Sequence, residues 1–187
     1  MQSKRMSALE IRRMIYAALY LAIALILPFL TGQIPQIGAM LSPMHIPVLL
    51  CGFLCGPVYG MLVGFIAPLL RSVLFGMPVL FPSAASMAFE LAAYGFCSGE
   101  LYRRLPSGKW SVYVSLILSM IIGRIVWGIM RAIFAGFVKT DFTMALFISG
   151  ALTSAIPGII LHIVLIPVLV VVMEKAGLSV NRKQTSR

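Results

Sequence analysis

Acidic residues are scarce in this chain of 187 residues. Only five are Asp or Glu, against fifteen Lys or Arg, and charged residues of both signs make up 11% of the sequence. That share is less than half of what soluble domains carry, whereas 60% of the residues are hydrophobic. The shortage of charge excludes an ordinary soluble domain and predicts an integral membrane protein.

The strict alternation of apolar and polar residues that marks a membrane β-barrel is also missing. Long apolar runs recur instead between Met14 and Met173. Because a helix satisfies its own backbone hydrogen bonds in lipid, these runs predict transmembrane helices and an all-α fold. The net charge of +10 does not indicate a nucleic-acid partner, since the basic residues flank the apolar segments, as the positive-inside rule expects.

Motifs of catalysis and metal binding are absent as well. The chain has no G-x-x-x-x-G-K-[ST] loop, which excludes ATP hydrolysis by that route, and no H-E-x-x-H or G-x-S-x-G. Its three cysteines form no disulfide framework, and the spacing of Cys51 and Cys55 is more typical of helix packing than of metal or redox chemistry. We therefore expect no catalytic residue, no metal ion and no cofactor.

A single membrane domain over residues 1–187 is predicted. Six spans are expected at about residues 14–30, 45–57, 58–76, 82–102, 110–137 and 144–173, with a basic cytoplasmic tail over residues 174–187. The N-terminal segment resembles a signal peptide, but no small-x-small cleavage site follows, so we expect it to be retained as the first helix.

Charge parity supports the count of six. The basic N-terminus and the basic loop around Arg103 should both face the cytoplasm, so an even number of crossings must separate them. The block from His45 to Gly76 must then cross twice, as two short helices with a hinge near Gly56. Both ends of the chain are expected in the cytoplasm.

Ionisable residues inside the predicted spans are the main indication of a functional site. On insertion scales each costs roughly 2.5–3.5 kcal/mol, and such residues normally face a cavity or a partner. The candidates of this kind are His45, Arg71, Glu90, Arg124, Arg131 and His162. Arg124 and Arg131 are two helical turns apart and share a helix face with Trp127.

Two interpretations of Glu90 remain open. Glu90 either forms a buried ion pair with one arginine or contributes to a ligand site. One carboxylate cannot neutralise three arginines, so the surplus favours a pocket for an anion, whose oxygens fit the guanidinium fork. Alternatively, Arg71 or Arg131 extends its charged head to the outer interface.

The remaining candidate residues are less specific. Tyr94, Phe81 and Trp127 could form the apolar wall of a ligand site, although packing is the commoner role. His45 fits either a hydrogen bond at a helix entry or a ligand contact, and His162 fits packing or an interhelical hydrogen bond.

Small residues on the first span indicate a docking face. Ala18 and Ala22 are spaced i,i+4, which lets another helix approach closely in lipid. Packing within the chain is the alternative.

Three stretches resemble a known family: LSPMHIPVLLCGFLCGPVYGMLVGFIAPLLRSVLFGMP, FPSAASMAFELAAYGFCSG and MIIGRIVWG. Together they are similar to the substrate-binding S components of energy-coupling factor (ECF) vitamin transporters, over about residues 14–173. The resemblance implies six helices, cytoplasmic termini, a location in a prokaryotic plasma membrane, and a vitamin site near the outer side. It also implies a transmembrane T component and two cytoplasmic ATPases as partners. The Ala18/Ala22 face would meet the T component, and transport would proceed by toppling of the S component in the lipid.

The resemblance leaves the substrate open. Surplus positive charge favours a small anionic vitamin, with pantothenate the first expectation. The candidate contacts are Arg124, Arg131, Trp127, Glu90, Arg71, His45, Tyr94 and Phe81. A neutral pyridine or pyrimidine vitamer is the alternative if Glu90 and the arginines neutralise each other. A membrane-embedded enzyme using Glu90 with a histidine, and an assembly subunit whose charges pair with another chain, are the rival functions.

Overall fold

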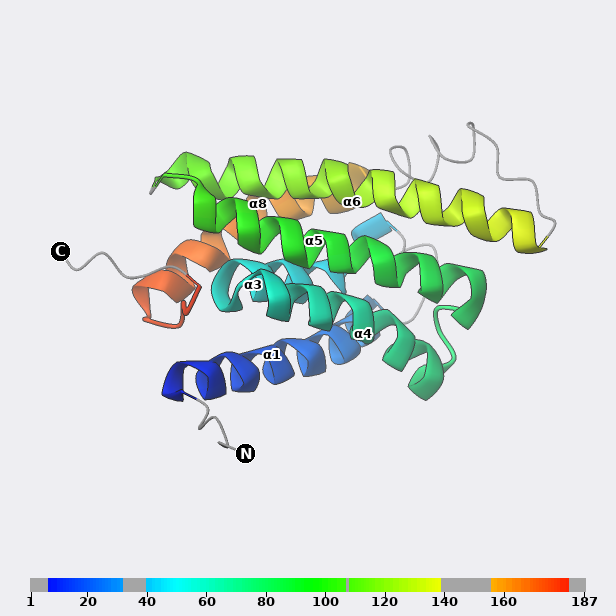
Figure 1. Cartoon of the computed structure of the whole chain (residues 1–187), viewed down its shortest axis with the longest axis horizontal. Coiled ribbons are helices and arrows are strands. Elements are labelled where there is room, and N and C mark those ends of the chain that lie inside the picture. Colours follow the sequence, from blue (N-terminus) through cyan, green and yellow to red (C-terminus); the bar gives the residue numbers. More distant parts are fainter. Residues whose placement is uncertain (1–6, 32–39, 107, 139–155, 182–187) are drawn as a thin grey trace, which may run out of the picture.

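The structure is a computed structural model that describes residues 7–31, 40–106, 108–138 and 156–181. These residues contain helices and no strand (Figure 1). The helices are α1 (Ala8–Ile26), η1 (Leu27–Thr31), α3 (His45–Cys55), α4 (Pro57–Phe75), η2 (Leu80–Ala84), α5 (Ala85–Arg104), α6 (Lys109–Val138) and α8 (Ile156–Lys175). The all-α prediction is confirmed for the part of the chain described here.

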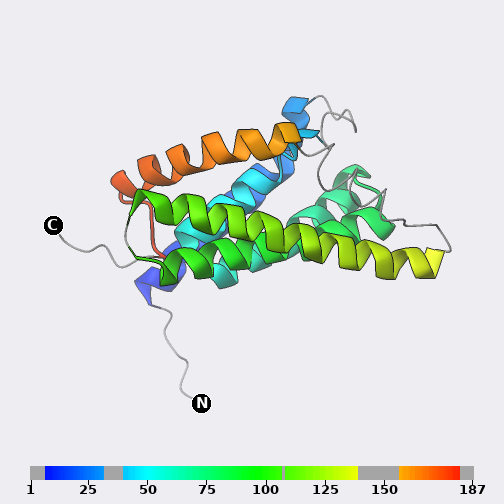
Figure 2. The same ribbon diagram turned by 90° about the horizontal axis from the view of Figure 1, so that it is seen from above.

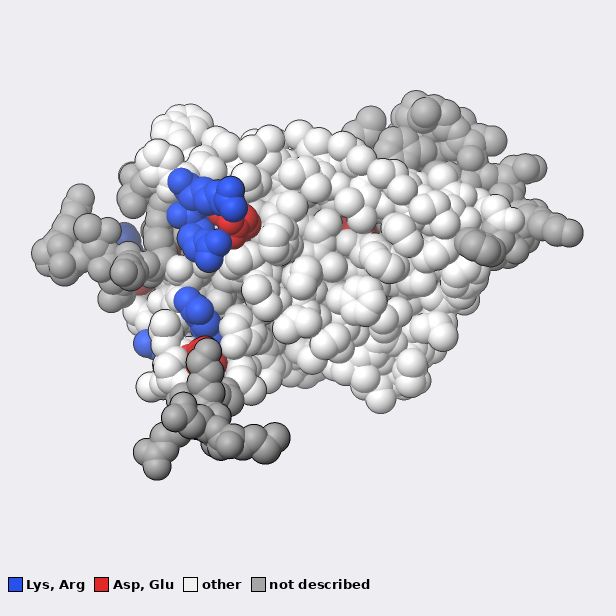
Figure 3. Space-filling view, viewed as in Figure 1, with Lys and Arg blue, Asp and Glu red and all other residues white. Residues whose placement is uncertain are grey.

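The long helices run back and forth in one elongated bundle (Figures 1 and 2). The starts of α1, α4 and α6 lie at the same end as the last turns of α3, α5 and α8. Figure 3 shows the Lys and Arg side chains of its visible face gathered at that end, which we call the charged end. The positive-inside rule predicts that this end faces the cytoplasm.

Within the described part of the chain, four helices are long and apolar enough to cross a membrane. These are α1 continued into η1 (Ala8–Leu30), α4, most of α6 (Trp110–Gly136) and α8. Helix α3 is shorter, with 11 residues, and α5 is not among the four. The multi-span architecture is therefore supported by the structure, whereas the count of six crossings stays a prediction.

The first helix begins earlier than the predicted residue 14. Ser7 caps it, because its hydroxyl accepts a hydrogen bond from the Glu10 backbone N–H and the Glu10 carboxylate accepts one from the Ser7 backbone. This reciprocal capping box starts the helix at Ala8. The predicted span, from about residue 14, covers only the apolar part of this helix, because the capping box is polar and the first turns carry charged residues. The sixth predicted span is described only from Ile156 onward, so its first part lies outside the described residues.

The predicted hinge between the second and third spans is present. Gly56 separates α3 from α4 with a φ of 106°, a conformation that residues with a Cβ rarely adopt. Pro57 then occupies the first turn of α4, where its missing N–H would have had no helical partner.

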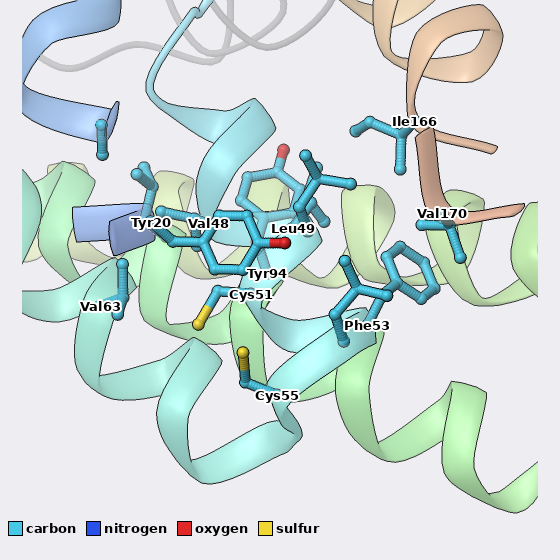
Figure 4. Packing of buried hydrophobic residues seen from close by; sticks show 14 of the residues in the cluster. Tyr20, Val48, Leu49, Cys51, Phe53, Cys55, Val63, Tyr94, Ile166 and Val170 are labelled. Carbon is cyan, nitrogen blue, oxygen red and sulfur yellow. The ribbon is translucent and has the colours of Figure 1, made fainter. Parts of the chain in front are cut away.

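Helix α3 forms the centre of the bundle. Ten of its eleven residues are buried, and its apolar side chains pack against those of α1, α4, α5 and α8 (Figure 4). Glycines allow the closest of these contacts. A methyl group on Gly95 of α5 would overlap the Gly60 carbonyl of α4, and one on Gly60 would lie 2.6 Å from the Gly52 Cα of α3. Three backbones therefore meet without intervening side chains, as in other tightly packed membrane helices.

The segment after α8, residues 176–181, folds back onto the charged end. The Val180 backbone N–H donates to the Leu54 carbonyl at 2.8 Å. The buried Asn181 amide donates to the carbonyls of Gly52 (3.4 Å), Phe53 (3.1 Å) and Gly99 (3.2 Å). This segment joins the ends of α3 and α5.

Candidate functional site

Glu90 lies at the centre of a buried group of polar side chains. It occupies the second turn of α5 and is 1% exposed. Its Oε1 atom lies 2.9 Å from Nη1 of Arg124 on α6 and 3.6 Å from Nε2 of His45 on α3. A buried carboxylate requires such partners, since removing a charge from water is unfavourable unless it is compensated.

Two histidines and a tyrosine complete the group. The ring centroid of His45 lies 5.9 Å from that of His162 on α8, with the rings nearly parallel. It lies 5.1 Å from the centroid of Tyr94, edge to face. Tyr94 fits against α6 because Gly123 has no side chain: a Cβ there would be 3.0 Å from the Tyr94 ring.

We call His45, Glu90, Tyr94, Arg124 and His162 the polar cluster. It draws on four helices and lies in the half of the bundle away from the charged end. His45 begins α3, and Glu90 and His162 stand in the second turns of α5 and α8, which all start at that side.

Several polar atoms of the cluster are buried but have no hydrogen-bond partner among the described residues. They are both ring nitrogens of His45, Nε2 of His162, Nε of Arg124 and Oε1 of Glu90. The contact between Glu90 and Arg124 is an ion pair, but its angles are not those of a hydrogen bond. An unsatisfied buried polar atom typically costs about 1–3 kcal/mol. Glu90 Oε1 still has electrostatic contacts with Arg124 and His45, but the atoms together leave hydrogen-bonding capacity that a polar ligand could use.

The charge of the cluster is close to balanced. Glu90 carries the negative charge and Arg124 the positive one, so the ion pair between Glu90 and one arginine, one of the two sequence interpretations, is present. Among the described residues, no three His, Cys, Asp or Glu side chains are grouped so as to hold a metal ion.

Three other candidate residues lie further from the charged end than Arg124. Trp127 and Arg131 are on α6, and Phe81 packs beside the later turns of that helix. The Arg131 guanidinium sits over the Trp127 ring, 5.9 Å from its centroid. Phe81, in η2, packs against Phe134 with ring centroids 4.9 Å apart. These residues therefore lie between the polar cluster and the end of the bundle where the outer loops are predicted.

Arg71 occupies a different place. It is 3% exposed, donates a hydrogen bond to the Leu25 carbonyl, and lies over the rings of Phe29 and Phe75 at 5.0 and 5.4 Å. These contacts fasten the end of α1 to the end of α4. The structure therefore does not group Arg71 with the polar cluster.

Ala18 and Ala22 lie on the exposed face of α1, whereas Ala17, Tyr20 and Ala24 form its buried face. The alternative of packing within the chain does not hold for this pair, because their side chains face outward.

From the sequence, His162 was expected to take part in packing or in an interhelical hydrogen bond, and Gly123 was not among the candidate residues. In the structure His162 stacks on the His45 ring, and Gly123 provides the surface against which Tyr94 packs. The signal for His162 was its position in an apolar span, but nothing in the sequence indicates that it faces His45.

Comparison with known proteins agrees with this architecture. The profile of the family described as "ECF transporter, substrate-specific component" matches residues 12–170, most of the chain. No curated protein and no solved structure gave a significant match. The chain belongs to the substrate-specific components of ECF transporters, and is thus a multi-pass plasma-membrane subunit that binds substrate and is not an enzyme.

Proposed function

We propose that this subunit binds one small water-soluble vitamin at the polar cluster and delivers it across the membrane with a T component and two cytoplasmic ATPases. The observation that carries the proposal is the set of buried, unsatisfied polar atoms on α3, α5, α6 and α8. A ligand that supplies both donors and acceptors would satisfy them.

The cluster offers a definite chemistry to such a ligand. The Arg124 Nε–H is a donor and Glu90 accepts, while His45 offers both ring nitrogens and His162 offers Nε2. The faces of the His45 and Tyr94 rings supply apolar contact. Arg131, two turns beyond Arg124, adds positive charge on the outer side.

Pantothenate fits this description best among the anionic vitamins. Its carboxylate would face Arg124 or Arg131, and its hydroxyl and amide groups would reach the histidines and Glu90. We include Trp127 and Phe81 as the apolar wall of the same site. In this proposal Arg71 does not contact the substrate and instead supports the end of α1.

A neutral pyridine or pyrimidine vitamer is the second candidate. It is favoured by one observation: Glu90 lies 2.9 Å from Arg124, so the charge of that arginine is offset within the protein. An aromatic ring could then stack on His45, with its nitrogens bonded to the cluster.

Calorimetric titration of the purified chain with pantothenate, pyridoxine and hydroxymethylpyrimidine tests the proposal. We expect pantothenate to bind, and Arg124→Ala to weaken binding about 100-fold or more, because a buried hydrogen-bonded charge contact is worth about 2–5 kcal/mol. Arg104→Ala removes an equal charge at the charged end, where that side chain is 74% exposed, and should bind like wild type.

The outcomes separate the alternatives. Preferential binding of a neutral vitamer would replace pantothenate with the second candidate. Binding of no vitamin, together with Arg124→Ala protein that no longer co-purifies with partner chains, would favour an assembly subunit and reject the proposal.

We also propose that Ala18 and Ala22 form the contact with the T component. Both are exposed, and larger exposed side chains flank them, including Ile15 (60%) and Leu19 (54%), so a partner helix could approach α1 most closely at the two alanines. Ala18→Leu with Ala22→Leu should abolish co-purification with the T component and leave vitamin binding unchanged. Val172→Leu adds bulk on the exposed face of α8 and serves as the control. Retained co-purification of the double variant would count against this contact.

A further inference from the structure

A cavity of about 1100 Å³ opens at the charged end, far from the polar cluster. Its walls come from the first turns of α1 and α4, the last turn of α5, and residues 177–181. The substrate site assigned above does not include any of these residues. The cavity therefore requires an explanation of its own.

Two neighbouring arginines on α1 line this cavity and are held in place by backbone carbonyls. Arg12 donates to the Tyr16 hydroxyl and to the Gly177 carbonyl. Arg13 donates through Nε and Nη2 to the Val180 carbonyl, at 3.2 and 2.7 Å. These bonds use two of the five N–H groups of each guanidinium, so further donors remain for an anion. Fixing the guanidinium also reduces the entropy that binding would otherwise cost.

The charge of the lining is positive. Arg12, Arg13 and Arg103 face the cavity, and Glu10 is the acidic residue among the lining side chains. Glu10 is engaged with the Ser7 backbone in the helix cap, and Arg103 contacts Glu100 at 2.7 Å. After these pairings the two α1 arginines still supply unbalanced positive charge. Figure 3 shows basic side chains gathered at this end.

One side of the cavity is apolar and continuous with the lipid-facing surface. Leu9 (48% exposed), Val58 (55%) and Leu62 (46%) line it. Along α4 the exposed apolar surface continues through Phe65 and Ile66. A small soluble anion would leave this apolar side uncovered, whereas an amphiphile would cover both parts of the cavity.

We propose that the cavity binds the headgroup of an anionic phospholipid. Its phosphate bonds to Arg12, Arg13 and Arg103, and its acyl chains lie along the exposed apolar face of α4 that Leu62, Phe65 and Ile66 form. The cavity lies at the cytoplasmic end of a plasma-membrane protein, where anionic headgroups attract basic residues. This site is independent of the vitamin site, and its presence or absence leaves the proposed substrate unaffected.

Native mass spectrometry of the full chain, released from nanodiscs of equal parts phosphatidylglycerol and phosphatidylcholine, tests the proposal. Wild-type protein should retain one phosphatidylglycerol molecule in preference to phosphatidylcholine. Arg12→Gln and Arg103→Gln should each lower that retention at least fivefold. Arg104→Gln is the matched control, because Arg104 neighbours Arg103 and contacts the same Glu100 but does not line the cavity.

Several results would overturn the proposal. Equal retention of both lipids, or an equal loss in Arg104→Gln, would show only a general attraction of the basic end. Displacement of the lipid by millimolar inorganic phosphate would point to a free anion, and displacement by an acidic partner peptide to a protein ligand. If Arg12→Gln fails to fold, Arg103→Gln decides, since that side chain is 54% exposed and its pairing is with a surface carboxylate.

Discussion

The Oε1 atom of Glu90, on α5, lies 2.9 Å from Nη1 of Arg124, on α6, in the half of the bundle away from the charged end. Each side chain would be unfavourable there alone. Buried ion pairs are weak evidence of stability, because the loss of hydration offsets the attraction between the charges. We interpret the pair as fixing the orientation of the two groups toward the ligand.

Removing one partner of this pair should destabilise the protein strongly. Glu90→Gln and Arg124→Gln should each lower the free energy of unfolding by about 3 kcal/mol, because the remaining charge is left buried. The double variant should lose much less than the sum. Reversible unfolding in mixed detergent micelles measures all three variants, and additive effects would show that the residues are not coupled.

Gly95→Ala should disrupt the packing of α4 against α5. The added methyl group would overlap the Gly60 carbonyl, and backbone cannot move aside as a flexible side chain can. We expect a loss of about 2–4 kcal/mol, at the upper end of ordinary point mutations. Gly136→Ala on α6 is the control, since no atom lies within 4 Å of the added methyl group. A thermal midpoint of Gly95→Ala at or above that of Gly136→Ala would contradict the close approach.

Asn181→Ala should loosen the charged end. Three backbone carbonyls lose their donor at once, and the expected loss of stability is about 1–3 kcal/mol. Amide hydrogen exchange should increase around Gly52 and Gly99, whose carbonyls accept hydrogen bonds from the Asn181 side chain. Vitamin binding at the polar cluster should persist. Ser179→Ala should change neither, because the Ser179 hydroxyl has no hydrogen-bond partner among the described residues. Unchanged exchange in Asn181→Ala would refute this role.

Arg71→Gln separates a structural role from a substrate contact. The variant weakens the contacts with Phe29, Phe75 and the Leu25 carbonyl, so the thermal midpoint should fall. Vitamin affinity measured well below that midpoint should stay within about twofold of wild type, a difference of about 0.4 kcal/mol. A loss of affinity comparable with that of Arg124→Ala would instead return Arg71 to the binding site.

Much of the architecture followed from local sequence. Apolar runs predicted membrane helices, and charge parity together with Gly56-Pro57 predicted the hinge that the structure has between α3 and α4. These features depend on residues that are neighbours in the chain. Helix α1 begins before the predicted span, because its capping box is polar and lies before the apolar run.

The site was predictable only as a set of candidates. An ionisable residue in an apolar span is visible in the sequence, so Glu90, Arg124 and His45 were all identified. Their grouping with His162, and the separation of Arg71 from them, depend on which helix faces which. That arrangement is set by packing between distant segments, above all the glycine contacts that bring α3, α4 and α5 together.

The sequence by itself determined that the chain is an all-helical membrane protein with buried charge, because hydrophobicity and charge act on each segment locally. Only the tertiary structure decided which charges meet and which backbone groups Asn181 bonds. Both depend on distances between residues far apart in the chain, which the packing of the helices fixes.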